Sequence, residues 1–277
     1  MTTTVGPLLR HWRERRRISQ LDLAISAEIS TRHLSFVETG RANPSRDMVL
    51  RLGEHLDVPL REQNRLLLAA GFAPAFAESA LGEPGMTVVR DAVRKVLAGH
   101  EPYPAVVVDR WWNLVDANSG LALLTEGVTP HLLEPPANVL RVALHPDGVL
   151  PRVLNPGQWR AELLGRLRSQ VEATADPGLT ELLDEVRDYP CPPGADVPHD
   201  GGIFVPLRIR HGDAELSFFS TIATFGAPLD VTVSELAIES FYPADQVTGD
   251  YLRRAAVGGR IGDASDHTRN DVRNVTT

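Results

Sequence analysis

The sequence is poor in the residues that several classes of protein require. It holds one cysteine, Cys191, in 277 residues, so neither an intrachain disulfide nor a cysteine-based zinc site can form. No apolar run approaches the roughly 18 residues that a membrane-spanning helix needs. The first residues also lack the apolar stretch of a signal peptide. We therefore expect a cytoplasmic protein with no membrane partner.

The common signatures of catalysis and metal binding are missing as well. The sequence contains no Gly-x-Ser-x-Gly motif, no phosphate-binding P-loop and no His-x-x-x-His pair. Cys191 lies between two prolines without an activating base nearby in sequence, which favours a structural thiol over a nucleophile. Four polar loop residues lack the spacing of metal ligands: Asp147, Asp196, His199 and Asp200. We predict no enzyme activity, no catalytic residue, no metal and no cofactor.

Charge is distributed unevenly along the chain. Arginine supplies 27 of the 28 basic residues, and Lys95 is the single lysine. Residues 1–70 hold eleven arginines and eight acidic residues, a net charge of +3, whereas the remainder carries −11. This asymmetry is typical of a basic nucleic-acid-binding part joined to an acidic part. A chance fluctuation would give the same split, so charge alone does not decide the function.

The pattern over residues 7–70 predicts five short helices. Apolar residues recur at helical spacing, and Ser19, Ser30 and Ser45 stand where N-caps are expected. Gly40 and Gly71 suit the left-handed residue that closes a helix. We expect an all-α five-helix domain over residues 1–72, followed by a linker rich in glycine and proline over residues 73–90.

Residues 19–41 predict a helix-turn-helix. Two helices of about eight residues meet at a tight connection, and Ala24 is small enough for their close approach. On the second helix Leu34 and Val37 face the core and leave short polar groups and an arginine outward. Such a surface at a helix N-terminus suits the DNA major groove. The candidate DNA contacts are Gln20, Ser30, Thr31, Arg32, Ser35, Phe36 and, in the following loop, Arg41.

Each of these candidates has a chemical reason. Arg32 can hydrogen-bond a guanine edge with two nitrogens, and Thr31 and Phe36 can contact a thymine methyl. Gln20 and Ser30 begin helices, whose positive dipole ends suit phosphate oxygens. The alternative is a plain helical bundle in which the outward side chains are only solvated, and periodicity alone does not separate the two.

These residues resemble the XRE, or lambda-repressor-like, helix-turn-helix family. Its pattern is matched by Ser19-Gln20, Leu23-Ala24, Ser30, Glu38-Thr39-Gly40-Arg41 and Pro44-Ser45. The turn position that often holds glycine in the family is Glu28 here, which strains the turn modestly. The resemblance implies a sequence-specific transcription regulator that binds double-stranded DNA as a homodimer on an inverted repeat.

From about residue 90 the pattern changes to mixed α and β. Helices are predicted over residues 91–97, 119–124, 159–174 and 177–186. Strands are predicted over residues 104–109, 113–117, 203–211, 215–225 and 231–242. Their alternation of apolar and polar residues indicates an antiparallel sheet. We expect an α+β domain over residues 91–257 and a flexible polar tail over residues 258–277.

Residues 104–124 resemble the opening of a PAS-like fold. Beside this N-terminal domain, residues 88–255 resemble the MmyB-like ligand-binding domain of bacterial regulators. That resemblance implies a one-component sensor of a small apolar ligand, of which a fatty-acid-like molecule is one example. Apolar side chains on the sheet are candidates for its pocket, and each also suits ordinary core packing: Val106, Val108, Trp112, Leu114, Phe204, Phe218, Phe219, Ile222 and Phe225.

Two other classes of function remain open. An enzyme in the second domain, with the first as a targeting module, needs a polar catalytic constellation that the sequence does not show. A protein-interaction adaptor would use the five-helix bundle against a partner protein. Salt dependence separates an adaptor from a DNA-binding protein, because DNA complexes weaken steeply as salt rises.

Overall fold

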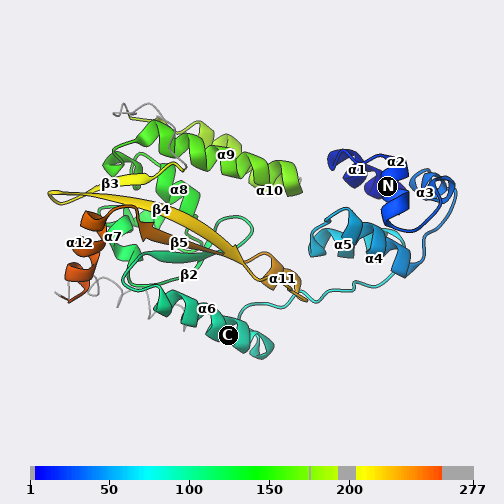
Figure 1. The fold of residues 1–277 in the computed structure, drawn as a ribbon, viewed down its shortest axis with the longest axis horizontal. Coiled ribbons are helices and arrows are strands. Elements are labelled where there is room, and N and C mark those ends of the chain that lie inside the picture. Colours follow the sequence, from blue (N-terminus) through cyan, green and yellow to red (C-terminus); the bar gives the residue numbers. More distant parts are fainter. Residues whose placement is uncertain (1–3, 175, 193–203, 258–277) are drawn as a thin grey trace. The chain divides into compact units, whose positions relative to one another are not determined.

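A computed structural model describes residues 4–174, 176–192 and 204–257 (Figure 1). The chain divides into two compact units. One comprises Met1–Met86 with Gly226–Ser234, and the other comprises Thr87–Phe225 with Glu235–Thr277. The first is a five-helix region, and the second is an α+β domain built on one five-stranded antiparallel sheet. The predicted fold class is therefore confirmed.

The helical unit begins with five helices in sequence order: α1 (Val5–Arg15), α2 (Gln20–Ser26), α3 (Thr31–Glu38), α4 (Arg46–His55) and α5 (Leu60–Ala69). The three serines placed as N-caps each accept a backbone hydrogen bond from the third residue of their helix. Gly40 and Gly71 have positive φ angles of 73° and 85°, as expected where a helix ends in the left-handed conformation.

The core of this unit brings α1 and α3 into close contact. Its fully buried leucines come from all five helices: Leu9, Leu23, Leu34, Leu52, Leu56, Leu66 and Leu67. A Cβ atom added at Gly6 would lie 2.3 Å from the carbonyl oxygen of Val37, so α1 requires glycine at this contact. The crossing fixes how α3 is oriented on the domain.

A short helix far along the chain also belongs to this unit. α11 (Val231–Ser234) lies where a strand was predicted over residues 231–242, so the first part of that prediction was wrong. The carboxylate of Asp230 accepts hydrogen bonds from the backbone N–H groups of Thr232 and Val233 and so starts a helical turn. The backbone N–H of Val231 donates to the carbonyl oxygen of Ala77 at 2.8 Å, which joins the segment to this unit.

The sheet of the second unit contains β1 (Ala105–Val108), β2 (Leu114–Ala117), β3 (Leu207–His211), β4 (Ala214–Thr224) and β5 (Ala237–Pro243). Its strand order is β2-β1-β5-β4-β3, with antiparallel neighbours throughout. The predicted third strand is shorter than expected at its start, because Pro206 has no N–H to donate to the ladder. The remainder of the predicted strands agree with the sheet to within a few residues.

The helices of this unit are α6 (Thr87–Gly99), α7 (Leu121–Thr125), α8 (Val139–Leu144), α9 (Pro156–Thr174), α10 (Pro177–Arg187) and α12 (Gln246–Val257). α9 and α10 pack side by side (Figure 1). Helices α7, α8 and α9 share one core with the buried face of the sheet. Sequence reasoning missed α8 and α12 and started α6 four residues late.

No helix in the described part of the chain combines the length and hydropathy needed to cross a membrane.

Candidate functional site

Helix α3 has a buried side and a solvent-facing side. Leu34 and Val37 are fully buried, whereas Arg32 is exposed. The guanidinium carbon of Arg32 lies 5.3 Å from the ring centroid of Phe36, so the cation packs on the aromatic face. Three candidates on this helix are half-buried: Thr31, Ser35 and Phe36. The N-terminal end of α3 therefore presents the guanidinium of Arg32 to solvent.

The other DNA-contact candidates lie at the ends of α2 and α3. Ser30 is exposed, and its Oγ accepts from the backbone N–H of His33 at 3.1 Å, which leaves its hydroxyl hydrogen to donate elsewhere. Gln20 differs, because its amide nitrogen donates to a carboxylate oxygen of Glu38 at 2.7 Å. Arg41 is exposed beyond the end of α3.

A buried ion pair fixes α3 to α1. Glu38 is 4% exposed, and both of its carboxylate oxygens accept from Arg13: Nε to Oε1 at 2.6 Å and Nη2 to Oε2 at 2.9 Å. This hydrogen bonding raises the pKa of the Arg13 guanidinium. Arg13 also donates to the carbonyl oxygen of Ile18 at 3.0 Å. Sequence reasoning matched Glu38 to the family pattern but assigned it no contact.

The turn between α2 and α3 has the strain expected of it. Glu28 has a φ angle of 55°, a left-handed conformation that glycine adopts more easily. The backbone N–H of Ile29 donates to the carbonyl oxygen of Ala24 at 2.9 Å, which closes α2.

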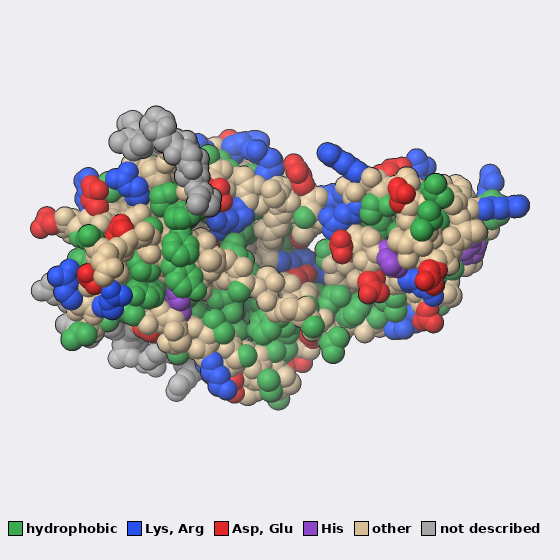
Figure 2. Space-filling view, in the orientation of Figure 1, with side chains coloured by type: hydrophobic (Ala, Val, Ile, Leu, Met, Phe, Trp, Pro, Cys, Tyr) green, Lys and Arg blue, Asp and Glu red, His purple; other side chains and the backbone are tan. Residues whose placement is uncertain are grey.

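On the face of the helical unit seen in Figure 2, basic and acidic side chains are interspersed. This face therefore carries no patch of a single charge sign.

The second unit contains an apolar cavity of about 90 Å³ between the buried face of the sheet and helices α7 to α9. One water molecule needs roughly 10–15 Å³ by this measure, so the space suits a small organic molecule. The sheet contributes Val106, Leu207 and Phe241 to its wall. The helices contribute, among others, Leu124, Leu140, Val142, Trp159 and Leu163.

Three of the nine residues proposed for the pocket line this cavity: Val106, Trp112 and Leu114. Val108 and Phe218 are buried in the core outside it. Phe204 and Ile222 are 49% and 42% exposed, and Phe225 follows the end of β4.

Phe219 lies on the opposite face of the sheet from Phe218, since neighbouring residues of a strand alternate faces. Its ring stacks on Tyr242 with centroids 5.2 Å apart. Strand alternation identified a buried face but not which stretch of it the helices cover, and Ile222 lies beyond the covered stretch. The helical side of the cavity was missed. The spacing of Trp159, Leu163 and Leu167 along α9 is the signal that could have indicated it.

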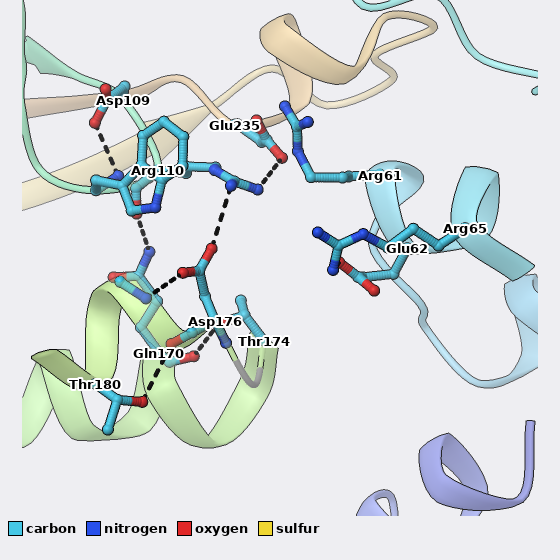
Figure 3. A network of polar contacts seen from close by, with 12 residues as sticks. Arg61, Glu62, Arg65, Asp109, Arg110, Gln170, Thr174, Asp176, Thr180 and Glu235 are labelled. Carbon is cyan, nitrogen blue, oxygen red and sulfur yellow. Dashed lines mark hydrogen bonds and ion pairs between the residues drawn. The ribbon is translucent and has the colours of Figure 1, made fainter. Parts of the chain in front are cut away.

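The wall residue Trp112 is held in place by α9. Its indole N–H donates to Gln170 Oε1 at 2.6 Å. The Gln170 amide in turn donates to the carbonyl oxygen of Arg110 at 3.0 Å (Figure 3). Arg110 also pairs with Asp176 at 3.3 Å and Glu235 at 3.5 Å. Trp112 has a φ angle of 66°, so this network maintains a backbone conformation that costs free energy.

One acidic side chain lines the otherwise largely apolar cavity. Glu239 on β5 is 5% exposed. Its Oε1 accepts from Arg166 Nη1 at 2.8 Å and from Ser220 Oγ at 2.7 Å. Arg166 also lies 3.6 Å from a carboxylate oxygen of Glu162. Sequence reasoning did not single out Glu239.

Two family models match the chain. Residues 5–66 match a helix-turn-helix domain, and residues 89–255 match the MmyB-like transcription regulator ligand binding domain. The chain belongs to the MmyB-like transcription regulators. It is thus a helix-turn-helix DNA-binding transcription regulator with an MmyB-like ligand-binding domain, and its family is not one of enzymes.

No curated protein matches the regulator. Among solved structures, an RNA-binding light-oxygen-voltage receptor is similar, with a TM-score of 0.27 and 11% sequence identity. The similarity covers 92% of this chain and 63% of that one, so the regulator spans less than two thirds of the receptor's length.

Of the four loop residues rejected as metal ligands, the structure describes only Asp147. Asp196, His199 and Asp200 lie outside the described residues. In the part of the regulator that is described, no group of three or more histidine, cysteine or acidic residues could hold a metal ion. Cys191 is half-buried, with its sulfur 3.7 Å from the carbonyl oxygen of Pro192.

A polar cluster joins α8 to α10 beside the cavity. Arg141 donates to both carboxylate oxygens of Glu185, at 2.8 and 2.7 Å, and this hydrogen bonding lowers the pKa of Glu185. Burial, followed by a hydrogen bond to Glu185, raises the pKa of the Tyr189 hydroxyl to about 12. The cluster braces α8, which forms one wall of the cavity.

Proposed function

We propose that this regulator is a cytoplasmic one-component sensor. Its domain over residues 1–72 binds a specific DNA sequence, and its domain over residues 91–257 binds a small apolar ligand with a fatty-acid-like chain. The linker would span residues 73–90. The polar tail expected over residues 258–277 lies outside the described residues. The observation that carries the DNA-binding part is the exposed Arg32, supported by Phe36, on a helix whose other side is core.

The contacts divide into base and phosphate contacts. Arg32 pairs with a guanine edge, and Thr31, Ser35 and Phe36 meet neighbouring bases. Phosphate contacts come from the N-terminal ends of α2 and α3 and from Arg41. The side-chain amide of Gln20 donates one of its two hydrogens to Glu38, so the backbone N–H at the start of α2 is the more available phosphate donor of Gln20.

Two copies of the regulator bind one operator. Each inserts α3 into a major groove, and the two grooves lie about 34 Å apart on an inverted repeat. Selection of bound fragments from random DNA tests this arrangement. It should return two inverted half-sites about one helical turn apart, and sedimentation should show two protomers on each site. A single undivided half-site bound by one protomer would contradict it.

Replacing Arg32 by alanine tests the base contact. The variant should lose about 1–3 kcal/mol of binding free energy on the selected operator and tolerate all four bases at one position of each half-site. Arg65→Ala is the matched control, because Arg65 is an exposed arginine on α5 paired with Glu62. Equal weakening on every sequence would mean that Arg32 contacts phosphate instead.

The ligand acts by shifting the dimer between geometries with different affinities for DNA. It can shift this balance only as far as its own affinities for the two states differ. The apolar wall of the cavity supports an apolar ligand. Replacing Ala143, which lines the cavity, by leucine should abolish the effect of extracted cell lipids on operator binding while the lipid-free protein still binds the operator. Retention of the lipid effect in this variant would exclude the cavity as the ligand site.

A further inference from the structure

The carboxylate of Glu239 is only half satisfied by the protein. Both of its hydrogen bonds, from Arg166 and Ser220, reach the same oxygen, Oε1. No group among the described residues donates to Oε2. Oε2 is not sealed off by protein, so solvent or a bound molecule in the cavity can reach its free lone pairs. Since Glu239 lines the cavity, a bound molecule is the natural source of a donor to Oε2.

The charges around this oxygen favour one kind of bound group. Arg166 lies between two carboxylates, those of Glu239 and Glu162, at 2.8 and 3.6 Å. The three side chains together carry a net charge of −1. A carboxylate placed beside them would be repelled and would compete with Glu239 for Arg166. A hydroxyl or an ammonium group would instead donate to Oε2.

We propose that the ligand of this cavity carries a hydrogen-bond-donating head, a hydroxyl or an amine, which binds Glu239 Oε2 while its alkyl chain fills the apolar space. This inference rests on the proposed ligand-binding function and names the polar end of that ligand. It assigns Glu239 as the residue that selects the head, and Arg166 and Ser220 as the residues that position its carboxylate. A free fatty acid then supplies the right chain but the wrong head.

Three probes with the same eight-carbon chain test the head directly: n-octylamine, 1-octanol and octanoate. Their affinities for the full-length protein are measured by calorimetry at pH 7. Octylamine and octanol should each bind at least ten times more tightly than octanoate. This comparison needs no variant, so it decides the question even if substitutions at Glu239 impair folding.

The variant Glu239→Gln removes the charge at nearly constant size. It should weaken octylamine binding by at least tenfold and bind octanoate more tightly than the unaltered protein does. Glu162→Gln is the matched control, since it removes the other carboxylate beside Arg166 without touching the cavity wall. Its ratio of octylamine to octanoate affinity should stay within threefold of the unaltered value. Thermal unfolding confirms that both variants are folded.

The outcomes separate this inference from the function on which it rests. If octanoate binds most tightly, or all three probes bind equally, the head assignment is wrong while an apolar ligand remains supported. If no probe binds at millimolar concentration, the apolar ligand itself is refuted together with the head.

Discussion

The ion pair between Arg13 and Glu38 should be the most sensitive polar contact of the helical unit. The side chain of Glu38 is 1% exposed. Its carboxylate accepts hydrogen bonds from two nitrogens of Arg13 and one nitrogen of Gln20. The variant Arg13→Met leaves this buried charge with Gln20 alone. Breaking a buried pair from one side costs about 3–5 kcal/mol, because the remaining charge is desolvated without a partner. For a domain of this size that lowers Tm by more than about 10 °C.

The assay is urea unfolding of the full chain, with hydrogen exchange of the α1 and α3 peptides to localise the effect. The double variant Arg13→Met with Glu38→Leu removes both charges and should recover most of the lost stability. Arg10→Met is the control, because Arg10 forms an exposed pair with Glu14 and should change little. A small loss for Arg13→Met, or a double variant as unstable as the single one, would refute the reasoning.

Two further predictions concern backbone strain and pH. Glu28→Gly should stabilise the protein by about 0.5–1 kcal/mol, because a φ of 55° costs glutamate more free energy than glycine. Urea unfolding measures this change in stability, and a loss of stability would count against a strained turn. Tyr189 should titrate near pH 12, later than an ordinary tyrosine, so its stabilising effect is present below about pH 10 and is lost as pH rises to about 12. Tyrosine absorbance with pH, compared between the protein and Tyr189→Phe, should show the late-titrating component only in the former.

The helical unit was predictable because its signals are local. Ser19, Ser30 and Ser45 each cap a helix through a residue three positions away, so sequence spacing alone contains the contact. The left-handed closure at Gly40 is equally local. The ion pair joining Arg13 to Glu38 is not, because it depends on how α1 crosses α3, and its partners lie 25 residues apart.

The cavity was only partly predictable, because its shape depends on which elements cover the sheet. Val106, Trp112 and Leu114 were proposed as apolar side chains on the sheet and do line the cavity, but the opposite wall comes from helices. Helix α8 has six residues, too few for periodicity to identify it. It begins where the side chain of Asn138 accepts from two backbone N–H groups, a capping signal that short apolar runs conceal.

Two buried carboxylates in this regulator are built alike and differ in one respect. Glu38 and Glu239 each pair with an arginine from a neighbouring helix and accept from one uncharged side chain, Gln20 or Ser220. Glu38 has donors on both oxygens and is complete within the protein. Glu239 has donors on one oxygen only.

This difference separates a structural pair from a binding site. A ligand that donates to Glu239 completes its hydrogen bonding and contacts a carboxylate that already joins β5 to Arg166 of α9. α9 also carries Gln170, which holds Trp112 in the cavity wall. Ligand binding at Glu239 is therefore coupled to β5 and α9, two elements that form walls of the cavity. A ligand without a donor fills the same space but leaves the second oxygen unpaired.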